Sequence, residues 1–254
     1  MVAQRPHLSV VAPARDEAEN VGALVEAVGK ALASVGFAFE LILVDDGSAD
    51  ATRAAVRECM PGRPWLRCIA LRGATPERAA GQSAAFHAGF RAARGDWVAG
   101  LDADLQNDPA DLPAMLARLE EAGAELVQGD RSAARRDPLV RRVGSGVGRL
   151  FRRLVLGDPV RDTGCSLRVM SRELALALPL ELAGSHRFVP RLARELGFRV
   201  EELPVRHRPR RAGRTKYGLG LGRALPGLLD GLAYAWLVRR RRPVDFDEVE
   251  PEGR

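Results

Sequence analysis

Cysteine is scarce in this chain of 254 residues, and so are the features that mark secreted or membrane-spanning proteins. The three cysteines are Cys59, Cys68 and Cys165, and no two of them form a Cys-x-x-Cys pair. This count argues against a disulfide framework or a structural zinc site and favours a reducing compartment. No apolar segment typical of a secretory signal follows the N-terminus. No run of about 18 residues is purely apolar, so an ordinary membrane span is not expected either.

Lysine is also nearly absent, and arginine carries almost all of the positive charge. Only Lys30 and Lys216 are lysines among the 39 basic residues. A general arginine bias makes any single arginine weak evidence of function, whereas Lys216 carries more information. Acidic residues are in excess over residues 1–130, and 26 basic residues face 9 acidic ones over residues 131–243. This asymmetry predicts a cation site in the first half and an anionic partner for the second.

The first 130 residues alternate between short apolar runs and segments with helical spacing. Continuous apolar strands that alternate with helices predict an α/β fold with a mostly parallel, Rossmann-like sheet between helices. The first turn lacks the Gly-x-Gly-x-x-Gly pattern, which disfavours a dinucleotide cofactor. Strands are expected over 7–12, 39–44, 66–71, 97–101 and 125–128, and helices over 19–33, 49–60, 76–94 and 109–121; later segments predict a helix over 143–156 and a strand over 198–205.

Polar clusters follow three of the expected strands, at Pro13–Glu17, Asp45–Ser48 and Asp102–Gln106. Ligands of open α/β sheets bind outside the carboxyl ends of the strands, so the three clusters are expected at one edge. Carboxylates of the second cluster could bind the ribose or base of a nucleotide, or the cluster could only cap the next helix.

Asp102 and Asp104 form the most informative pair. Two residues apart in extended chain, their carboxylates point to the same side of the backbone. There they could hold Mg²⁺ or Mn²⁺ together with phosphate oxygens of a diphosphate-bearing donor, and Gln106 could add a carbonyl oxygen. The alternative interpretation is a solvated acidic turn.

Four motifs, taken in order, resemble those of glycosyltransferase family 2. The similarity runs from about residue 7 to residue 240 and is strongest to dolichol-phosphate mannosyltransferases and bacterial polyprenyl-phosphate glycosyltransferases. It implies a GT-A fold and inverting transfer of a hexose from a nucleotide sugar, of the GDP-mannose or UDP-glucose type, to a polyprenyl phosphate. The motifs are Pro13-Ala-Arg-Asp-Glu17, Val44-Asp-Asp-Gly-Ser48, Gly81-Gln-Ser-Ala-Ala85 and Asp102-Ala-Asp-Leu-Gln106.

The resemblance also implies a set of site residues and a divalent metal, Mg²⁺ or Mn²⁺. Asp102, Asp104 and Gln106 would hold the metal. Arg15 and Asp16 stand where the family often has Tyr and Asn, which leaves the preferred base open. The residues implied around the nucleotide are Pro13, Arg15, Glu17, Val44 and Asp46, and those around the diphosphate are Asp102, Ala103, Asp104 and Gln106.

The basic half contains two further similarities to the family. Gly129-Asp-Arg131 resembles its Gly-Ser-Arg, and Arg210-Arg-Ala-Gly-Arg-Thr-Lys216 resembles its Arg-x-x-Gly-x-Ser-Lys motif. By this resemblance Arg131, Arg210 and Lys216 bind phosphates, and Asp104, Arg131 and Lys216 take part in catalysis. Arginine offers phosphate a bidentate fork and lysine a compact charge.

A polyprenyl phosphate acceptor is already an anion, so its transfer reaction needs no strong general base. A hydroxyl acceptor would need a carboxylate base. The only obvious candidate after residue 130 is Asp162, which mildly favours the phosphate acceptor. Asp162 could also orient an arginine and Arg168 could meet the acceptor, or either residue could belong to a structural ion pair.

Residues 219–242 have a broad apolar face and end in four arginines. This pattern predicts one or two amphipathic helices on an anionic membrane surface, although packing on the catalytic domain or a dimer contact would also explain it. The protein is then expected to be peripheral on the cytoplasmic face of the membrane. The predicted organisation is a catalytic domain over 1–217, with a nucleotide-sugar half (1–130) and an acceptor half (131–217), interfacial helices over 218–243 and a flexible acidic tail over 244–254.

Three other functions fit parts of the sequence. A nucleic-acid-binding protein would explain the basic half, but the arginines are not interleaved with aromatic residues and no known binding module is present, so no nucleic acid partner is expected. A nucleotidyltransferase would carry a glycine-rich phosphate loop near the first strand. A family 2 enzyme with a soluble saccharide acceptor stays open as the nearer alternative. No pattern indicates an oligomeric state.

Overall fold

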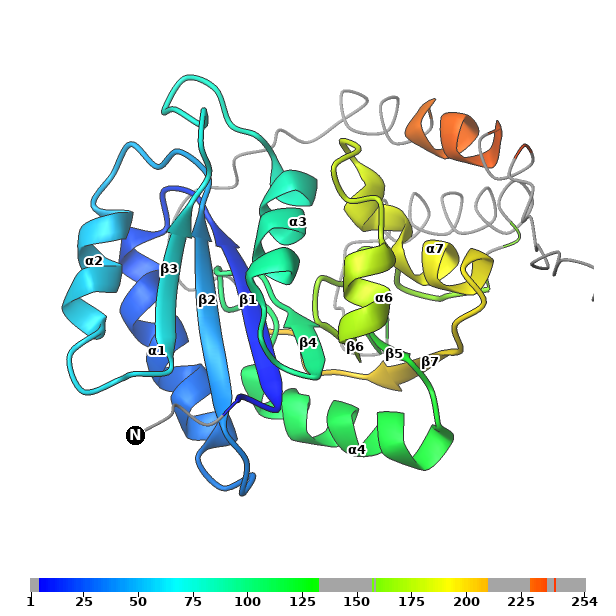
Figure 1. The fold of residues 1–254 in the computed structure, drawn as a ribbon, viewed down its shortest axis with the longest axis horizontal. Coiled ribbons are helices and arrows are strands. Elements are labelled where there is room, and N and C mark those ends of the chain that lie inside the picture. Colours follow the sequence, from blue (N-terminus) through cyan, green and yellow to red (C-terminus); the bar gives the residue numbers. More distant parts are fainter. Residues whose placement is uncertain (1–4, 133–156, 158, 210–228, 237–239, 241–254) are drawn as a thin grey trace, which may run out of the picture.

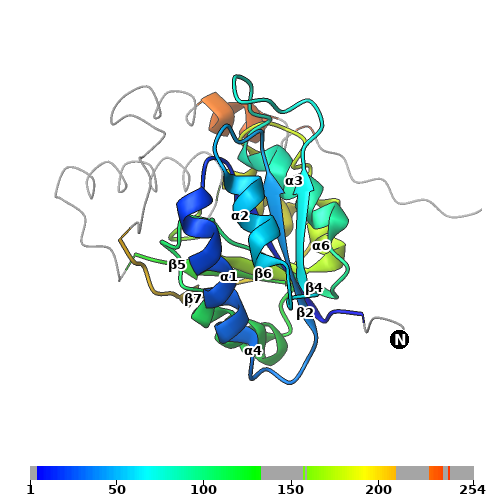
Figure 2. The ribbon, with the colours of Figure 1, turned by 90° about the vertical axis from the view of Figure 1, so that its left-hand side faces the viewer.

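A seven-stranded sheet forms the centre of the part of the chain that the computed structural model describes, residues 5–132, 157, 159–209, 229–236 and 240. The strands lie in the order β3-β2-β1-β4-β6-β5-β7, with helices on both faces (Figure 1, Figure 2). The expected α/β fold with a mostly parallel sheet is confirmed. Within the described residues, no helix combines the length and the apolar character needed to cross a membrane.

The described helices and strands lie between residues 8 and 236. In chain order they are β1 (Leu8–Ala14), α1 (Ala18–Leu32), β2 (Phe39–Asp45), α2 (Thr52–Cys59), β3 (Leu66–Ala70), α3 (Gln82–Ala92), β4 (Trp97–Gly100), η1 (Pro109–Asp111), α4 (Leu112–Ala122), β5 (Leu126–Asp130), β6 (Arg168–Ser171), α6 (Arg172–Ala177), η2 (Ser185–Phe188), α7 (Val189–Glu195) and β7 (Val200–Pro204), and a helical segment covers 229–236.

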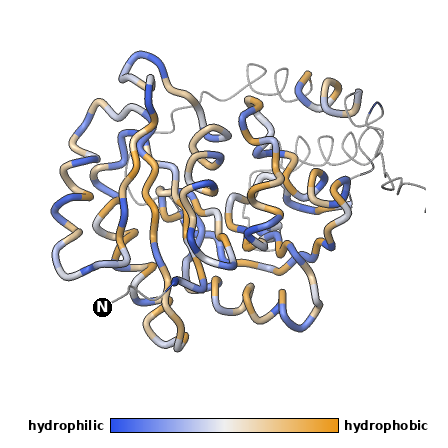
Figure 3. The backbone as a smooth tube through the Cα atoms, in the orientation of Figure 1, coloured by the Kyte–Doolittle hydropathy of each residue, from blue (hydrophilic) through white to orange (hydrophobic). Residues whose placement is uncertain are grey.

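The central strands are apolar along their length because both faces of the sheet are covered. Val10 of β1 belongs to a core cluster shared with α1 and α4, while the next residue, Val11, belongs to a second cluster shared with α3. Figure 3 shows hydrophobic residues gathered along β1 and β2, whereas α2 carries many hydrophilic ones. Because neither face of β1 meets solvent, its sequence lacks the alternation of polar and apolar residues typical of half-exposed strands.

One expectation about the elements is wrong, and one strand was not predicted. The helix expected over 76–94 begins only at Gln82, because Gly81 has a left-handed backbone with φ 96° and the residues before it form a loop. The strand that was not predicted is β6, which lies between β4 and β5 and pairs antiparallel with both. β6 is four residues long and begins with Arg168, too short a run to give a strand pattern.

Other expectations agree with the structure or fall outside it. β7 confirms the strand expected over 198–205. The helix expected over 143–156 and the domain boundary expected at residue 217 lie outside the described residues.

The carboxyl ends of β1, β2 and β4 meet at one edge of the sheet. The parallel register sets Ala14 beside Asp45. The Asp46 amide then donates to the Ala14 carbonyl at 3.0 Å, and the Leu101 amide donates to the Val11 carbonyl at 3.0 Å. The three polar clusters predicted to share an edge therefore leave the sheet side by side.

Candidate functional site

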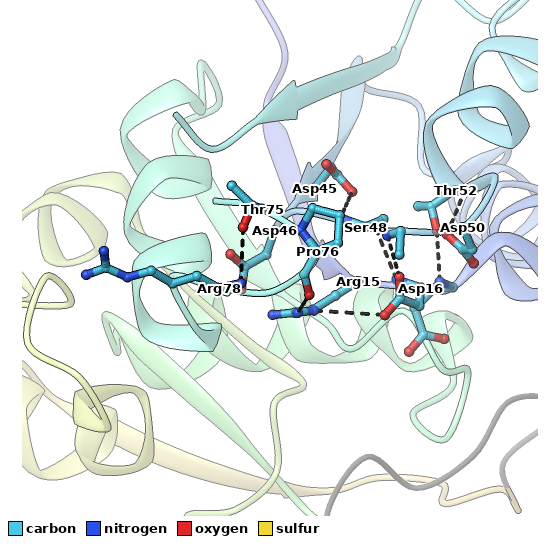
Figure 4. A network of polar contacts seen from close by, with 12 residues as sticks. Arg15, Asp16, Asp45, Asp46, Ser48, Asp50, Thr52, Thr75, Pro76 and Arg78 are labelled. Atoms are coloured by element: carbon cyan, nitrogen blue, oxygen red, sulfur yellow. Dashed lines mark hydrogen bonds and ion pairs between the residues drawn. The ribbon is translucent and has the colours of Figure 1, made fainter. Parts of the chain in front are cut away.

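The loop after β1 is joined to the loop after β2 by hydrogen bonds through Asp16 and Ser48 (Figure 4). The amide of Asp16 donates to Ser48 Oγ at 3.0 Å, and Asp16 Oδ1 accepts from the Ala49 amide at 2.7 Å. Asp16 has a left-handed backbone, φ 49°, which is uncommon for a residue with a side chain. The two loops thus form one surface beside the ends of β1 and β2.

The neighbouring carboxylates of Asp45 and Asp46 have different partners. Asp45 Oδ2 lies 2.6 Å from both Nε and Nη2 of Arg53 on α2, an ion pair that fixes the helix to the strand end. Asp46, which is 5% exposed, accepts hydrogen bonds from the amides of Ala80 at 2.7 Å and Gly81 at 2.8 Å. Asp46, the predicted nucleotide residue, therefore also holds the loop that leads into α3.

Gly47 allows that loop to approach closely. A β-carbon at Gly47 would lie 2.7 Å from the carbonyl oxygen of Thr75 and 2.8 Å from its nitrogen, and the backbone φ of Gly47 is +72°. Only glycine suits such a conformation at such a short separation. Arg15 contacts the same loop, because its Nη2 donates to the carbonyl of Pro76 at 2.6 Å.

Three further residues predicted around the nucleotide support this surface to different degrees. Pro13 lies in β1, beside Val44 of β2. The side chain of Val44 is fully buried in the α3-side core, so it does not face the loops. Glu17 precedes α1, where its amide donates to Thr52 Oγ1 at 2.9 Å and its Oε2 accepts from Asn20.

Asp102 and Asp104 lie together directly after β4. Gln82 at the start of α3 donates from Nε2 to Asp102 Oδ1 at 2.8 Å, and Ser166 also hydrogen-bonds this carboxylate. Desolvation raises the pKa of Asp102, and repulsion from the Asp104 carboxylate raises it further. Asp104 is 6% exposed, and its Oδ1 accepts from the amide of Gln106 at 3.1 Å. Two crowded carboxylates in this setting favour a bound cation, which would relieve their repulsion.

The backbone between Asp104 and Gln106 is strained. Leu105 has φ 59°, and together with Asp16 it is one of two non-glycine residues in the described part of the chain with a left-handed backbone. Such conformations persist only where the surroundings enforce them, and they are concentrated at functional sites. Both fall in loops predicted to bind the donor.

The segment 162–168 contacts the Asp102 carboxylate through Ser166. Ser166 Oγ accepts from Asn107 Nδ2 at 2.8 Å, which orients the hydroxyl toward Asp102. Cys165 is fully buried, and burial raises the pKa of its thiol to about 11. A buried thiol of this kind is not a nucleophile at neutral pH, so Cys165 is a packing residue.

Arg131 is held in a buried ion pair with Asp162. Its Nε lies 2.7 Å from Asp162 Oδ2 and its Nη2 lies 3.1 Å from Asp162 Oδ1, a bidentate arrangement, and its backbone amide also donates to Oδ2 at 3.2 Å. Both side chains are less than a tenth exposed. Arg131, predicted to bind phosphate, therefore has a fixed orientation. Its contact with a substrate stays a prediction.

The residues just before the basic motif are hydrogen-bonded to the loop that carries the carboxylates. The Arg208 amide donates to the carbonyl of Gln106 at 2.8 Å, and His207 forms a β-bridge with Asn107. The Arg208 guanidinium also pairs with Asp108. Arg210 and Lys216 lie outside the described residues, and the last described contact before them joins Arg208 to Gln106, one of the predicted metal ligands.

Several residues of this site were missing from the sequence prediction. Gln82 and Ser166 both hydrogen-bond Asp102, although only the motif around Gln82 was singled out. Ser166 and Asn107 belong to segments far apart in the chain, so no local sequence pattern predicts their contact.

Among the described residues no group of three or more His, Cys, Asp or Glu side chains is arranged to hold a metal ion.

Comparison with solved structures defines the class of fold. Glucosyl-3-phosphoglycerate synthase from Mycobacterium tuberculosis, in complex with Mn²⁺, UDP-glucose and phosphoglyceric acid, matches 91% of this chain with a TM-score of 0.65 at 23% identity, over 79% of its own chain. The same enzyme with Mg²⁺ and UDP matches 92% of this chain with a TM-score of 0.64 at 22% identity, over 79% of its own. The fold is therefore the GT-A type of glycosyltransferases.

Sequence comparison gives the family. The model of glycosyl transferase family 2 matches residues 9–177, and the chain belongs to this family of glycosyltransferases. It is 36% identical to dodecaprenyl-phosphate galacturonate synthase of Rhizobium johnstonii, over 96% of this chain and 71% of that protein. It is 34% identical to undecaprenyl-phosphate 4-deoxy-4-formamido-L-arabinose transferase of Edwardsiella ictaluri, over 84% of this chain, and spans 63% of the length of that protein.

Proposed function

We propose that this chain is an inverting, metal-dependent glycosyltransferase that moves a hexose from a nucleotide sugar to a polyprenyl phosphate. The observation that carries the proposal is the likeness, over nearly the whole chain, to an enzyme named for a lipid-phosphate product. The paired carboxylates of Asp102 and Asp104, at the end of β4 beside β1, support it independently.

The residues present fit a divalent cation. Asp102 and Asp104 supply hard carboxylate oxygens, and Gln106 lies two residues further on. Mg²⁺ and Mn²⁺ are commonly held by one or two carboxylates, with substrate phosphate oxygens and water completing the shell. When bound, the cation supplies positive charge that stabilises a departing nucleoside diphosphate.

The donor is assigned to the joined loops after β1 and β2. The nucleoside would be surrounded by Pro13, Arg15, Glu17 and the loop after β2 that begins with Asp46. Ala103 would lie against the diphosphate. The fixed hydrogen bonds of Asp16 and Asp46 orient these loops before the donor arrives. Preorganised loops of this kind lose little conformational freedom on binding.

The acceptor phosphate would attack the anomeric carbon from the face opposite the diphosphate, so the configuration inverts. A phosphate oxygen is already an anion, and the step requires positioning and charge rather than a general base. Arg131, Arg210 and Lys216 are assigned to the phosphates of donor and acceptor. Asp162 orients Arg131 through hydrogen bonds from Nε and Nη2.

We assign the membrane contact to the helical segment 229–236. Its packed side includes Ala235, 6% exposed, whereas Leu229, Leu232 and Trp236 are each about half exposed on the other side. Arg240 lies over the Trp236 ring, 4.6 Å from its centroid. An apolar face with tryptophan and arginine at its edge suits the anionic cytoplasmic leaflet, where the enzyme would be peripheral.

The transfer reaction can be tested with radiolabelled nucleotide sugars and undecaprenyl phosphate in the presence of Mg²⁺ or Mn²⁺. GDP-mannose and UDP-glucose belong in the panel, and a uronic acid donor and an aminosugar donor are added because the similar enzymes are named for such sugars. We expect label from one donor to enter the organic phase. A folded, nucleotide-binding protein that transfers no label to the lipid would contradict the lipid acceptor and favour a soluble saccharide.

The membrane surface predicts a second result. Trp236→Ala combined with Leu232→Ala should weaken sedimentation with vesicles that contain anionic lipid by on the order of tenfold, since both side chains bury apolar area in the interface. Leu176→Ala is the matched control, because Leu176 is 36% exposed on α6 and lies outside the proposed surface. Equal vesicle binding by the double variant and the wild type would refute the assignment.

A further inference from the structure

The helical segment 229–236 is seated on η2 by two contacts, and it lies close to the glycine that precedes η2. The rings of Phe188 and Tyr234 stack with centroids 5.0 Å apart and planes 2° from parallel. Arg187 Nη1 lies 3.3 Å from Asp230 Oδ2. A β-carbon at Gly184, the residue before η2, would lie 2.7 Å from that same Asp230 oxygen.

Gly184 has φ +82°, so this turn requires glycine for its backbone as well as for the space that Asp230 occupies. The seat of the helix is therefore specific, and it differs from the exposed side of the same helix, which carries Leu232 and Trp236.

The other side of η2 is bound to the first turn of α3. His186 Nδ1 lies 2.7 Å from Ser83 Oγ, and the His186 amide donates to the same oxygen at 3.3 Å. Ser83 Oγ thus accepts the amide hydrogen and gives its own hydroxyl hydrogen to Nδ1. The imidazole suits this role because burial, and then the charges of Arg168 and Arg187, lower the pKa of His186 to about 3, which keeps it neutral.

The first turn of α3 also contacts the predicted metal site. Gln82, next to Ser83, donates to Asp102 Oδ1 at 2.8 Å. A second link runs from the carbonyl of His186, which accepts from Arg168 Nη1 at 3.1 Å. Arg168 is buried, and its charge acts on the Asp102 carboxylate. One short 3-10 turn thus contacts both the outer helix and the supports of Asp102.

We propose that His186 is a positioning residue: through Ser83 it fixes Gln82 against Asp102, and it does so while the helix 229–236 is seated on η2. The inference rests on the assignment of Asp102 to the active site. Contact of the outer side of the helix with a membrane would stabilise this seat. The carboxylates are then best ordered when the enzyme is at the surface that holds its acceptor.

Hydrogen–deuterium exchange tests the link without donor, acceptor or metal. The readout is the exchange rate of the amides of residues 85–88, the first hydrogen-bonded turn of α3, where Ala85 donates to Gly81. We expect His186→Ala and Tyr234→Ala each to accelerate this exchange roughly tenfold, because each opens the chain of contacts. The double variant should exchange no faster than the faster single variant, because the two residues act in series.

Two controls separate positioning from general destabilisation. Trp236→Ala alters the exposed side of the same helix and should leave exchange at 85–88 unchanged. Amides of β1 (Leu8–Ala14) should also exchange as in the wild type, since global unfolding would accelerate them too. His186→Asn, whose side-chain oxygen can accept from Ser83, should restore most of the protection.

The proposal is wrong if Tyr234→Ala leaves residues 85–88 protected, or if β1 and α3 accelerate together. A concentration series of Mn²⁺ adds a functional readout: His186→Ala should raise the concentration that gives half-maximal transfer severalfold, and His186→Asn should not. The exchange result does not depend on the acceptor. Failure of the lipid transfer assay and failure of this coupling are therefore distinguishable.

Discussion

Asp104→Asn is expected to lower sugar transfer by about 10³-fold while leaving the protein folded. The substitution removes one of two charges that would hold a divalent cation, and charge stabilisation of a leaving diphosphate contributes several kcal/mol to such a reaction. The amide keeps the shape of the side chain and can still accept from the Gln106 amide. Initial rates with saturating Mn²⁺, together with thermal unfolding of the variant, measure the effect.

The matched control is Asp96→Asn. Asp96 precedes β4 at the opposite end of that strand, where it forms an exposed ion pair with Arg5. Exposed pairs of this kind contribute little to stability, so this variant should keep full activity. Removal of divalent cations with a chelator should silence the wild type, and Mn²⁺ should restore it. An Asp104→Asn enzyme with near-normal rates would show that the carboxylate pair has no catalytic role.

Asp162→Ala is expected to be the most destabilising single change in the site. It leaves the Arg131 guanidinium buried without its bidentate partner, and breaking a buried ion pair in this way costs about 3–5 kcal/mol. For a chain of this size that loss lowers the unfolding temperature by on the order of 10 °C. Differential scanning fluorimetry or calorimetry of the purified variant measures it directly.

A paired substitution separates stability from function at this position. Arg131→Met with Asp162→Leu removes both buried charges, and it should recover most of the stability that the single change loses. Transfer should stay low in this stable double variant, because the arginine assigned to phosphate is gone. Full activity would instead mean that the ion pair only supports the fold. As a reference for an ion pair that is not buried, Arg118 and Glu201 can be replaced together.

The sequence predicted the features of this protein that are local. Strand ends followed by carboxylates placed Asp46, Asp102 and Asp104 at one edge, because a parallel sheet leaves little freedom in where its strand ends meet. Continuous apolar runs likewise predicted β1, β2 and β4 with bounds close to those observed.

The features that sequence reasoning missed depend on long-range contacts. The loop before α3 was included in the helix expected over 76–94, but Asp46 accepts hydrogen bonds from the amides of Ala80 and Gly81, more than 30 residues away, and holds the backbone in a loop. Such competition between a carboxylate and helical hydrogen bonds leaves no periodic signal. The position of β6 between β4 and β5 is a similar case, since an insertion of a strand from later in the chain is a matter of topology.

The hydrogen bonds of Asp46 also carry a thermodynamic consequence. Asp46 holds the amide of Gly81, and the next residue, Gln82, holds Asp102. The nucleoside end and the diphosphate end of the proposed donor site are therefore joined through two consecutive residues. If the nucleotide and the cation each order this junction, linkage requires that each raises the affinity of the other by the same factor. The affinity measured for either ligand alone would then be lower than its affinity in the presence of the other.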